Sequence, residues 1–205
     1  MTQTLEEILH ESSLRHKHLC PRQILGARMA LYACEMLNLD LPRADKRLLV
    51  IAETDGCTVD GLIAATNCRV GSRTLRILDF GKVAATFTDT HAETSFRIVP
   101  QPEVRSTAYE YMPTAKNKWE AMLLGYQTMP ASELFIVQQV VLNISISEII
   151  SRPGAKAVCE SCNEEIINGR EETRFGKLLC RSCAGDGYYN LQHIVHQRVA
   201  EKYGS

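Results

Sequence analysis

Four cysteines near the C-terminus have the spacing of a metal site. Cys159, Cys162, Cys180 and Cys183 form the pattern C-x2-C-x17-C-x2-C. Two C-x-x-C pairs at such a separation typically bind one tetrahedral zinc ion, because each pair lies on a tight turn that directs both sulfurs at the metal. A segment this short buries little apolar surface, so metal binding would supply most of its folding free energy. We therefore predict a structural zinc finger at the end of the chain.

A second set of metal-binding side chains lies near the N-terminus. His16, His18 and Cys20 read H-x-H-x-C. Because Pro21 disfavours a helical conformation at Cys20, we expect the segment to be extended. Residues i, i+2 and i+4 of an extended segment point the same way, which would place both imidazoles and the thiol on one side. Together with Cys57 they suit a transition metal with an open coordination position, and we expect that metal to be zinc.

Two of these cysteines, Cys20 and Cys57, each come directly before an expected helix. Backbone N–H groups and the dipole at a helix start favour the thiolate, the form that binds metals and attacks electrophiles. Cys68 lies at the far end of the helix that follows Cys57, about 16 Å away if every step is helical. Cys68 is therefore a ligand of the same ion only if that helix is shorter. Cys34 lies on an apolar helix face and is expected to be a small buried hydrophobe.

The elements that would position these residues alternate between helical and extended patterns. Helices are expected over residues 4–14, 21–39, 58–67, 116–126 and 188–203, and strands over residues 48–53, 74–79, 83–88, 94–99 and 134–146. Residues 80–82 and 89–93 read as hairpin connections. This order favours an α+β domain with a mostly antiparallel sheet and flanking helices over residues 1–150. A linker at residues 151–154 then leads into the zinc finger of residues 151–205.

Composition limits the partners and the compartment. The chain has 205 residues and a formal net charge of -1. Residues 151–205 hold eight basic and seven acidic residues, which weighs against phosphate-driven binding of nucleic acid. The charged N-terminus has no secretory signal, and the stretch 134–150 is too polar to span a bilayer. Eight cysteines without a secretion signal indicate a reducing cytoplasm and metal or redox use.

Several blocks of the sequence, taken together, resemble the FmdE family, which is named after the E subunit of molybdenum or tungsten formylmethanofuran dehydrogenase. The blocks are His16 to Pro21, Gly26 and Arg28, Glu53 to Cys57 with Asp60, Cys68, Gly71 and Leu75, and Asp79 to Ala84. The resemblance covers residues 10–145 and implies an α+β domain that is often a homodimer. It also implies a Cys/His metal cluster at His16, His18, Cys20, Cys57 and Cys68. Some members of the family carry a C-terminal zinc-ribbon or treble-clef finger.

Two positions depart from the pattern of that family. Lys17 stands where a glycine usually separates the two histidines, and Arg22 replaces the glycine that follows Cys-Pro. Both changes put bulk and positive charge beside the cluster. Its geometry or its ligand is therefore expected to differ from the family pattern.

Three functions follow from these features. The first is a cytoplasmic, homodimeric metal-binding protein, accessory to a molybdenum or tungsten redox enzyme or to metal handling. The second is a metal- or thiol-dependent enzyme acting on a one-carbon or pterin-linked substrate, with Cys20, Cys57, Asp60 and Lys82 as catalytic candidates. The third is a zinc-finger module that binds protein or nucleic acid, which the near-neutral charge of residues 151–205 disfavours.

Overall fold

The computed structural model describes residues 3–16, 18–150 and 154–193, with the side chains of residues 15 and 16 outside the description. The chain divides into two compact units, Met1–Ile150 and Ser151–Ser205. Within the described residues, every helix is too short or too polar to cross a membrane.

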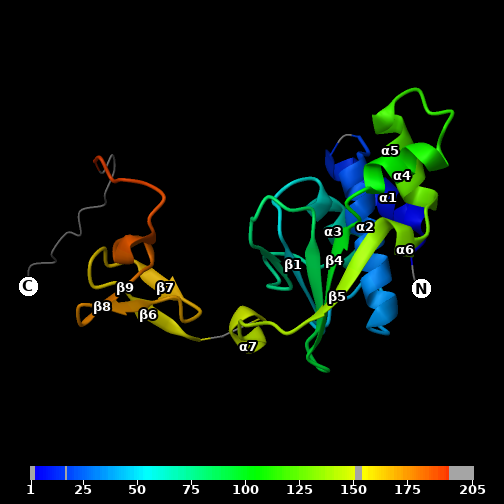
Figure 1. The fold of residues 1–205 in the computed structure, drawn as a ribbon. Helices are drawn as coiled ribbons and strands as arrows, with labels where there is room; N and C mark the ends of the chain where they lie inside the picture. The colour runs from blue at the N-terminus through cyan, green and yellow to red at the C-terminus, as the bar shows by residue number, and fades with distance from the viewer. Residues whose placement is uncertain (1–2, 17, 151–153, 194–205) are drawn as a thin grey trace, which may run out of the picture. The chain divides into compact units, whose positions relative to one another are not determined.

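The first unit is built on a five-stranded sheet (Figure 1). Its strands are β1 (Leu48–Ala52), β2 (Leu75–Ile77), β3 (Ala85–Asp89), β4 (Thr94–Pro100) and β5 (Phe135–Val140). Its helices are α1 (Leu5–His16), α2 (Pro21–Met36), α3 (Thr58–Thr66), α4 (Val104–Tyr111), α5 (Lys118–Thr128), α6 (Ala131–Leu134) and α7 (Ile146–Ile150). The strand order is β2-β1-β3-β4-β5, and of these neighbours β1 and β2 are parallel while the other pairs are antiparallel. The predicted α+β class with a mostly antiparallel sheet is confirmed.

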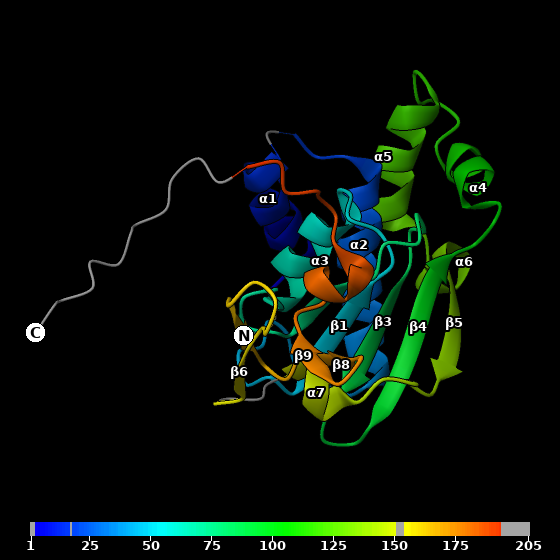
Figure 2. The same cartoon turned by 90° about the vertical axis from the view of Figure 1, so that its left-hand side faces the viewer.

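Strand β1 is covered on both faces, which explains its unbroken apolar sequence, LLVIA. Leu48 and Val50 belong to the main core that the sheet forms with helices α1, α2 and α3. Leu49 and Ile51 pack instead with Ile149 of α7. Figure 2 shows β1 at the centre of these layers, with α2 behind the sheet.

The connection between β2 and β3 is not the predicted hairpin. Strand β2 pairs in parallel with β1, and β1 lies between β2 and β3. A parallel pair needs a crossover rather than a tight turn, and α3 provides it. The segment that was expected to be a hairpin passes the end of β1, where the N–H groups of Phe80 and Lys82 each donate to the Glu53 carbonyl at 3.0 Å. Lys82 is thereby held beside the start of the β1–α3 connection.

Other sequence predictions differ from the structure at the edges of elements. Helix α4 was not predicted, because it is only eight residues long and buries only Val104 and Ala108. The last predicted strand ends at Val140 and is followed by the short helix α7. The terminal helix predicted from Tyr188 is wrong over residues 188–193, which are irregular, and its remainder lies outside the described residues.

Helices α2 and α3 approach each other closely because each has a glycine at the contact. A Cβ atom on Gly26 would lie 2.2 Å from the carbonyl oxygen of Thr58. A Cβ atom on Gly61 would lie 2.0 Å from the carbonyl oxygen of Gln23. Both distances are shorter than any real Cβ contact with a backbone atom, so only glycine permits this packing.

The glycine contact predicts that Gly61→Ala destabilises the domain, although alanine is ordinarily the better helix former by about 1 kcal/mol. We expect a loss of about 3 kcal/mol in the free energy of unfolding, because the rigid backbone of α2 must move to admit the methyl group. Urea unfolding followed by circular dichroism measures it. Gly71→Ala is the control, since nothing lies within 4 Å of the added atom there. Equal stability of the two variants would contradict a glycine-dependent contact.

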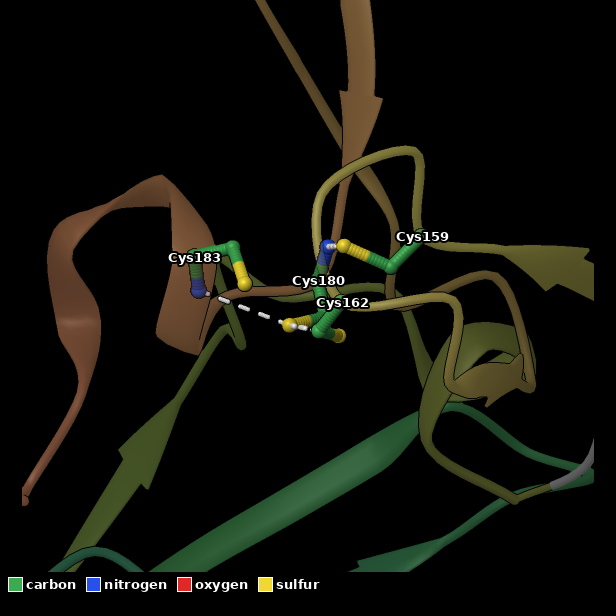
Figure 3. A group of neighbouring side chains, drawn as sticks. All are labelled: Cys159, Cys162, Cys180 and Cys183. Atoms are coloured by element: carbon green, nitrogen blue, oxygen red, sulfur yellow. Dashed lines mark hydrogen bonds between the residues drawn. The ribbon is translucent and has the colours of Figure 1, made fainter. Parts of the chain in front are cut away.

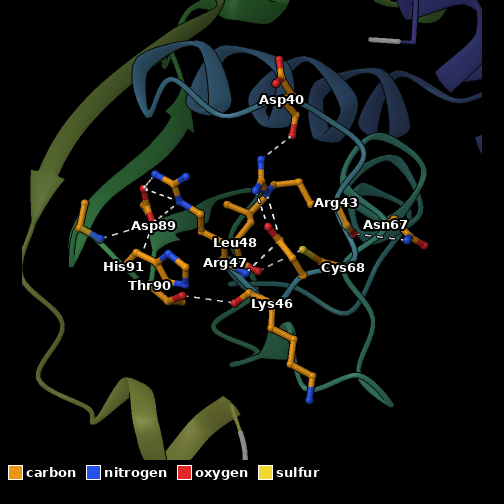
Figure 4. Close-up of polar contacts among 12 residues, drawn as sticks. Asp40, Arg43, Lys46, Arg47, Leu48, Asn67, Cys68, Asp89, Thr90 and His91 are labelled. Carbon is orange, nitrogen blue, oxygen red and sulfur yellow. Dashed lines mark hydrogen bonds and ion pairs between the residues drawn. The ribbon is translucent and has the colours of Figure 1, made fainter.

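Asp89 anchors the turn between β3 and β4 (Figure 4). Arg47 donates to its carboxylate through Nε at 3.0 Å and Nη2 at 2.8 Å, and the backbone N–H of His91 donates at 2.9 Å. The Asp89 side chain is only 2% exposed. These donors, chiefly the Arg47 guanidinium, lower the pKa of Asp89 to about 2.

This lowered pKa makes the stability of the domain depend on acid pH. The contribution of Asp89 is complete above its unfolded pKa of about 3.9 and is lost as pH falls through its folded pKa of about 2. We expect Asp89→Asn to lower the free energy of unfolding at pH 7, because the ion pair with Arg47 is lost. The loss should be about 1–2 kcal/mol, since Arg47 is partly exposed and solvent weakens the pair. Urea unfolding at several pH values should show the difference from wild type narrowing below about pH 4. A difference that stays constant with pH would assign the loss to packing instead.

Candidate metal sites and the adjoining cavity

The second unit carries its four cysteines on two short hairpins and the turn that follows. The elements are β6 (Lys156–Val158), β7 (Glu165–Ile167), β8 (Glu172–Arg174), β9 (Lys177–Leu179) and the short helical turn η1 (Ser182–Asp186). Strand β6 pairs with β7 and β8 pairs with β9, both antiparallel. Cys159 and Cys162 lie in the β6–β7 turn, Cys180 follows β9, and Cys183 lies in η1. Figure 3 shows the four side chains gathered at one place.

The four sulfurs have the spacing of a tetrahedral metal site. All of them lie within 4.8 Å of one another, and the Sγ atoms of Cys162 and Cys180 are 3.9 Å apart. Zinc–thiolate bonds of about 2.3 Å give sulfur–sulfur separations of about 3.8 Å in a regular tetrahedron. The residues therefore fit a four-coordinate ion with no ligand from outside the unit.

The charges that the four thiols would carry when ionised also favour a bound cation. The backbone N–H groups of Cys162 and Cys180 point at the sulfur of Cys159 and lower its pKa to about 6. The contact with the Cys180 thiol raises the pKa of Cys183. Sulfurs this close cannot all ionise on their own, because each thiolate opposes the next. A dication removes that opposition and allows four thiolates.

The apolar core of the second unit is very small. Among its described residues, Cys159, Ile166, Leu179 and Ala184 form the buried cluster. So little buried apolar surface cannot offset the chain entropy of an ordered segment of this length. Metal binding must supply the remaining stability.

Removing the metal should therefore unfold the second unit alone. We expect a strong chelator, added to the full chain, to collapse the dispersed amide NMR signals of Ile166 and Leu179 toward random-coil positions. Signals of core residues such as Val50 should not move, because the first unit has its own core. Added zinc should restore the spectrum. Persistence of the dispersed signals in metal-free protein would show that the hairpins fold without an ion.

In the first unit, Cys20 and Cys57 come into contact. Cys20 precedes α2 in an extended conformation, with φ -126° and ψ 156°, and Cys57 directly precedes α3. The close packing of these helices brings their first turns together, and the Cys57 thiol lies near enough to that of Cys20 to raise its pKa. Burial, and then this contact, raises the pKa of Cys20. The thiolate preference expected at a helix start is thus outweighed by desolvation.

Gln23 holds Cys20 in place. Its side-chain Oε1 accepts from the Cys20 N–H at 2.7 Å, and its Nε2 donates to the carbonyl and hydroxyl oxygens of Ser12, both at 3.0 Å. Gln23 and Ser12 are fully buried. The end of α1 is therefore linked through one amide to the first turn of α2.

Of the two predicted histidine ligands, the described His18 does not join these thiols in a group of three metal-binding side chains. His16 ends α1, so the expected extended spacing fails at that residue, and its side chain lies outside the described residues. His18 is exposed. Among the side chains that the structure describes, the four cysteines of the second unit are the only group of three or more metal-binding residues.

Cys68 lies at the opposite end of α3 from Cys57. Its Sγ donates to the Leu48 carbonyl at 3.5 Å (Figure 4), and burial raises its pKa. Cys34 lies nearby, and burial raises the pKa of its thiol to about 12. Both are core thiols, and the structure separates Cys68 from the Cys20–Cys57 pair.

A cavity of about 730 Å³ adjoins that pair. Cys20, Cys57 and Lys82 all line it, so three of the four catalytic candidates meet at one place. Asp60, in the first turn of α3, is not among the described residues that line it.

Arg28 fixes the helix that forms the far wall of the cavity. Its guanidinium donates to the carbonyl oxygens of Tyr126 at 2.8 Å, Gln127 at 3.0 Å and Met129 at 2.8 Å, which are the otherwise unpaired groups at the end of α5. Burial lowers the pKa of Arg28. The contact of Arg28 with the end of α5 was not predicted from the sequence. An arginine on an apolar helix face was the feature that could have indicated such a contact.

A protein-family model described as "FmdE, Molybdenum formylmethanofuran dehydrogenase operon" matches residues 15–136. The chain belongs to the FmdE family. That match covers more than half of the sequence and confirms the predicted resemblance. It spans the Cys20–Cys57 pair, the cavity and most of the sheet.

Two further proteins are similar to this FmdE-family chain. One, from Archaeoglobus fulgidus, is named "Probable S-adenosyl-L-methionine-binding protein" and is 35% identical over 85 residues, which are 40% of this chain and 23% of that protein. The chain thus spans about a quarter of the length of that relative. The other is a crystal structure from Syntrophus aciditrophicus, of a protein like the E subunit (FmdE) of tungsten formylmethanofuran dehydrogenase. It superposes with a TM-score of 0.60 at 19% identity, over 92% of this chain and 96% of that one, and shares the fold.

Proposed function

We propose that this FmdE-family chain is a cytoplasmic metal-binding protein with two centres of different kinds. The observation that carries the proposal is the contact between Cys20 and Cys57 at the starts of two helices, on the wall of a cavity. Thiols at that position suit a transition metal, and backbone N–H groups at a helix start favour their ionised form once an ion is bound.

The two centres differ in how many ligands the chain supplies. The four cysteines of the second unit would hold a structural zinc ion, since four thiolates complete its coordination. Cys20 and Cys57 would hold a second ion, with His16 at the end of α1 or His18 in the α1–α2 connection as a third ligand. Three ligands leave one position open, as is typical of zinc sites that act on another molecule. We leave Cys68 out of this set, because it lies beyond the end of α3 that is opposite Cys57.

The biological role proposed is accessory. The family is named after a component of a molybdenum or tungsten enzyme, which supports a redox-enzyme or metal-handling partner. We also propose that the chain assembles as a homodimer, as the family resemblance implies. The nearly balanced charge of residues 151–205 supports a protein rather than a nucleic acid as the partner of the finger.

One observation favours a second candidate, a metal- or thiol-dependent enzyme. Cys20, Cys57 and Lys82 line the same cavity, which has a volume in the range of small-molecule sites. A metal or thiolate with an adjacent ammonium group can polarise a one-carbon or pterin-linked substrate. Under this alternative the open metal position would face the substrate.

The metal content of full-length variants tests the proposal. We expect two metal ions per wild-type chain by native mass spectrometry and elemental analysis. Cys20→Ser/Cys57→Ser should lose one ion with its circular dichroism unchanged, because both side chains lie at helix starts and not in the core. Cys159→Ser/Cys162→Ser should lose the other ion.

Cys34→Ala is the matched control, because it removes a buried thiol outside both centres, and it should keep both ions. Wild-type metal content in Cys20→Ser/Cys57→Ser would overturn the N-terminal centre. The two cysteines would then be packing or redox residues.

A further inference from the structure

The wall of the cavity beside Cys20 and Cys57 has an unbalanced charge. Arg22, Lys82 and Arg105 line it, and none of the described residues that line it is an aspartate or glutamate. All three basic side chains are exposed, so their charged ends are available to a ligand. Lys82 lies near Glu53, but that carboxylate is already bridged by Arg97 at 2.5 Å and does not line the cavity.

Helix starts add to this positive potential. The first turns of α2 and α4 both contribute to the cavity, through Pro21 and Arg22 in α2 and through Val104 and Arg105 in α4. Each helix start carries a partial positive charge. Charged side chains and helix starts of one sign around a concave site favour an anion there.

The remaining wall is apolar and aromatic. Helix α5 contributes Trp119, Met122 and Tyr126, and Leu25 faces the cavity from α2. Trp119 is 49% exposed, although the ring of a tryptophan is among the most costly surfaces to leave in water. A flat or apolar ligand would cover that ring while its anionic group met the basic residues.

We propose that this cavity binds a small molecule in which a carboxylate or phosphate group is attached to a planar, apolar body. The anionic group lies among Arg22, Lys82 and Arg105, and the planar body lies against Trp119. This places the ligand beside the Cys20–Cys57 pair. The site goes beyond the proposed metal centre and does not need it, because the basic residues and Trp119 are separate from the thiols.

The test uses the full chain and the indole N–H of Trp119. This is the only tryptophan in the sequence, so it gives a single NMR signal that reports on the cavity. The probes are 1-naphthoate and 1-naphthyl phosphate, with neutral 1-naphthylmethanol as the matched control. We expect both anions to shift the indole signal saturably, at concentrations about tenfold or more below the neutral probe, since charge-assisted hydrogen bonds are lost with the alcohol.

Substitutions test whether the preference for anionic probes depends on the residues that line the cavity. Arg22→Gln/Arg105→Gln should remove most of the preference for anions, whereas Lys118→Gln, an exposed residue of α5 outside the cavity lining, should keep it. Saturation at lower concentrations with naphthyl phosphate would identify a phosphate ligand, and saturation at lower concentrations with naphthoate would identify a carboxylate.

Three results would overturn the proposal: equal binding of the neutral probe, the same loss in Lys118→Gln, or no saturable shift with any probe. The same titration on Cys20→Ser/Cys57→Ser separates this proposal from the metal centre. Anion binding retained there, whatever the metal content, would support the cavity site on its own.

Discussion

The close contact of α2 with α3 is the constraint on which the candidate site depends. Gly26 and Gly61 let each backbone touch the other helix, and no larger residue fits at either position. Because Cys20 and Cys57 each stand one residue before these helices, the helix packing sets how close their backbones lie. A thiol pair built in this way is rigid, since its geometry is fixed by the main core and not by loop conformation.

The two cysteine clusters illustrate opposite relations between metal and fold. In the second unit the apolar core is very small and includes the metal-binding Cys159, so the ion and the folded state form together. In the first unit the core is complete without Cys20 and Cys57, which lie at its edge beside a cavity. An ion bound there would be free to exchange or react without unfolding the domain. The same residue type therefore has a structural use in one unit and suits a functional use in the other.

Much of the fold could be predicted from periodicity, and the exceptions have physical causes. The run Leu48 to Ala52 is continuously apolar, so β1 was recognisable as a strand with both faces covered, and Asn67 marked the end of α3 with its left-handed conformation, φ 59°. The parallel pairing of β2 could not be predicted, because two N–H bonds to the Glu53 carbonyl redirect the chain where local sequence suggested a turn. The extended backbone predicted at His16 is not observed, because α1 extends to that residue despite a polar sequence. Such outcomes depend on tertiary contacts that short sequence patterns do not contain.

The two proposed centres differ in the number of ligands that the chain supplies, and this difference implies different roles for the two ions. Four thiolates within 4.8 Å can satisfy an ion completely and leave it nothing further to bind. Cys20 and Cys57 supply only two sulfurs, and even with one histidine the coordination stays incomplete on the side of the cavity. That side carries Arg22, Lys82 and Arg105, whose charges oppose a bare dication and favour an anionic group that could complete its coordination. The anion site does not require the metal, because the basic residues and Trp119 are separate from the thiols, so the cavity and the thiol pair are neighbouring sites that can be occupied independently.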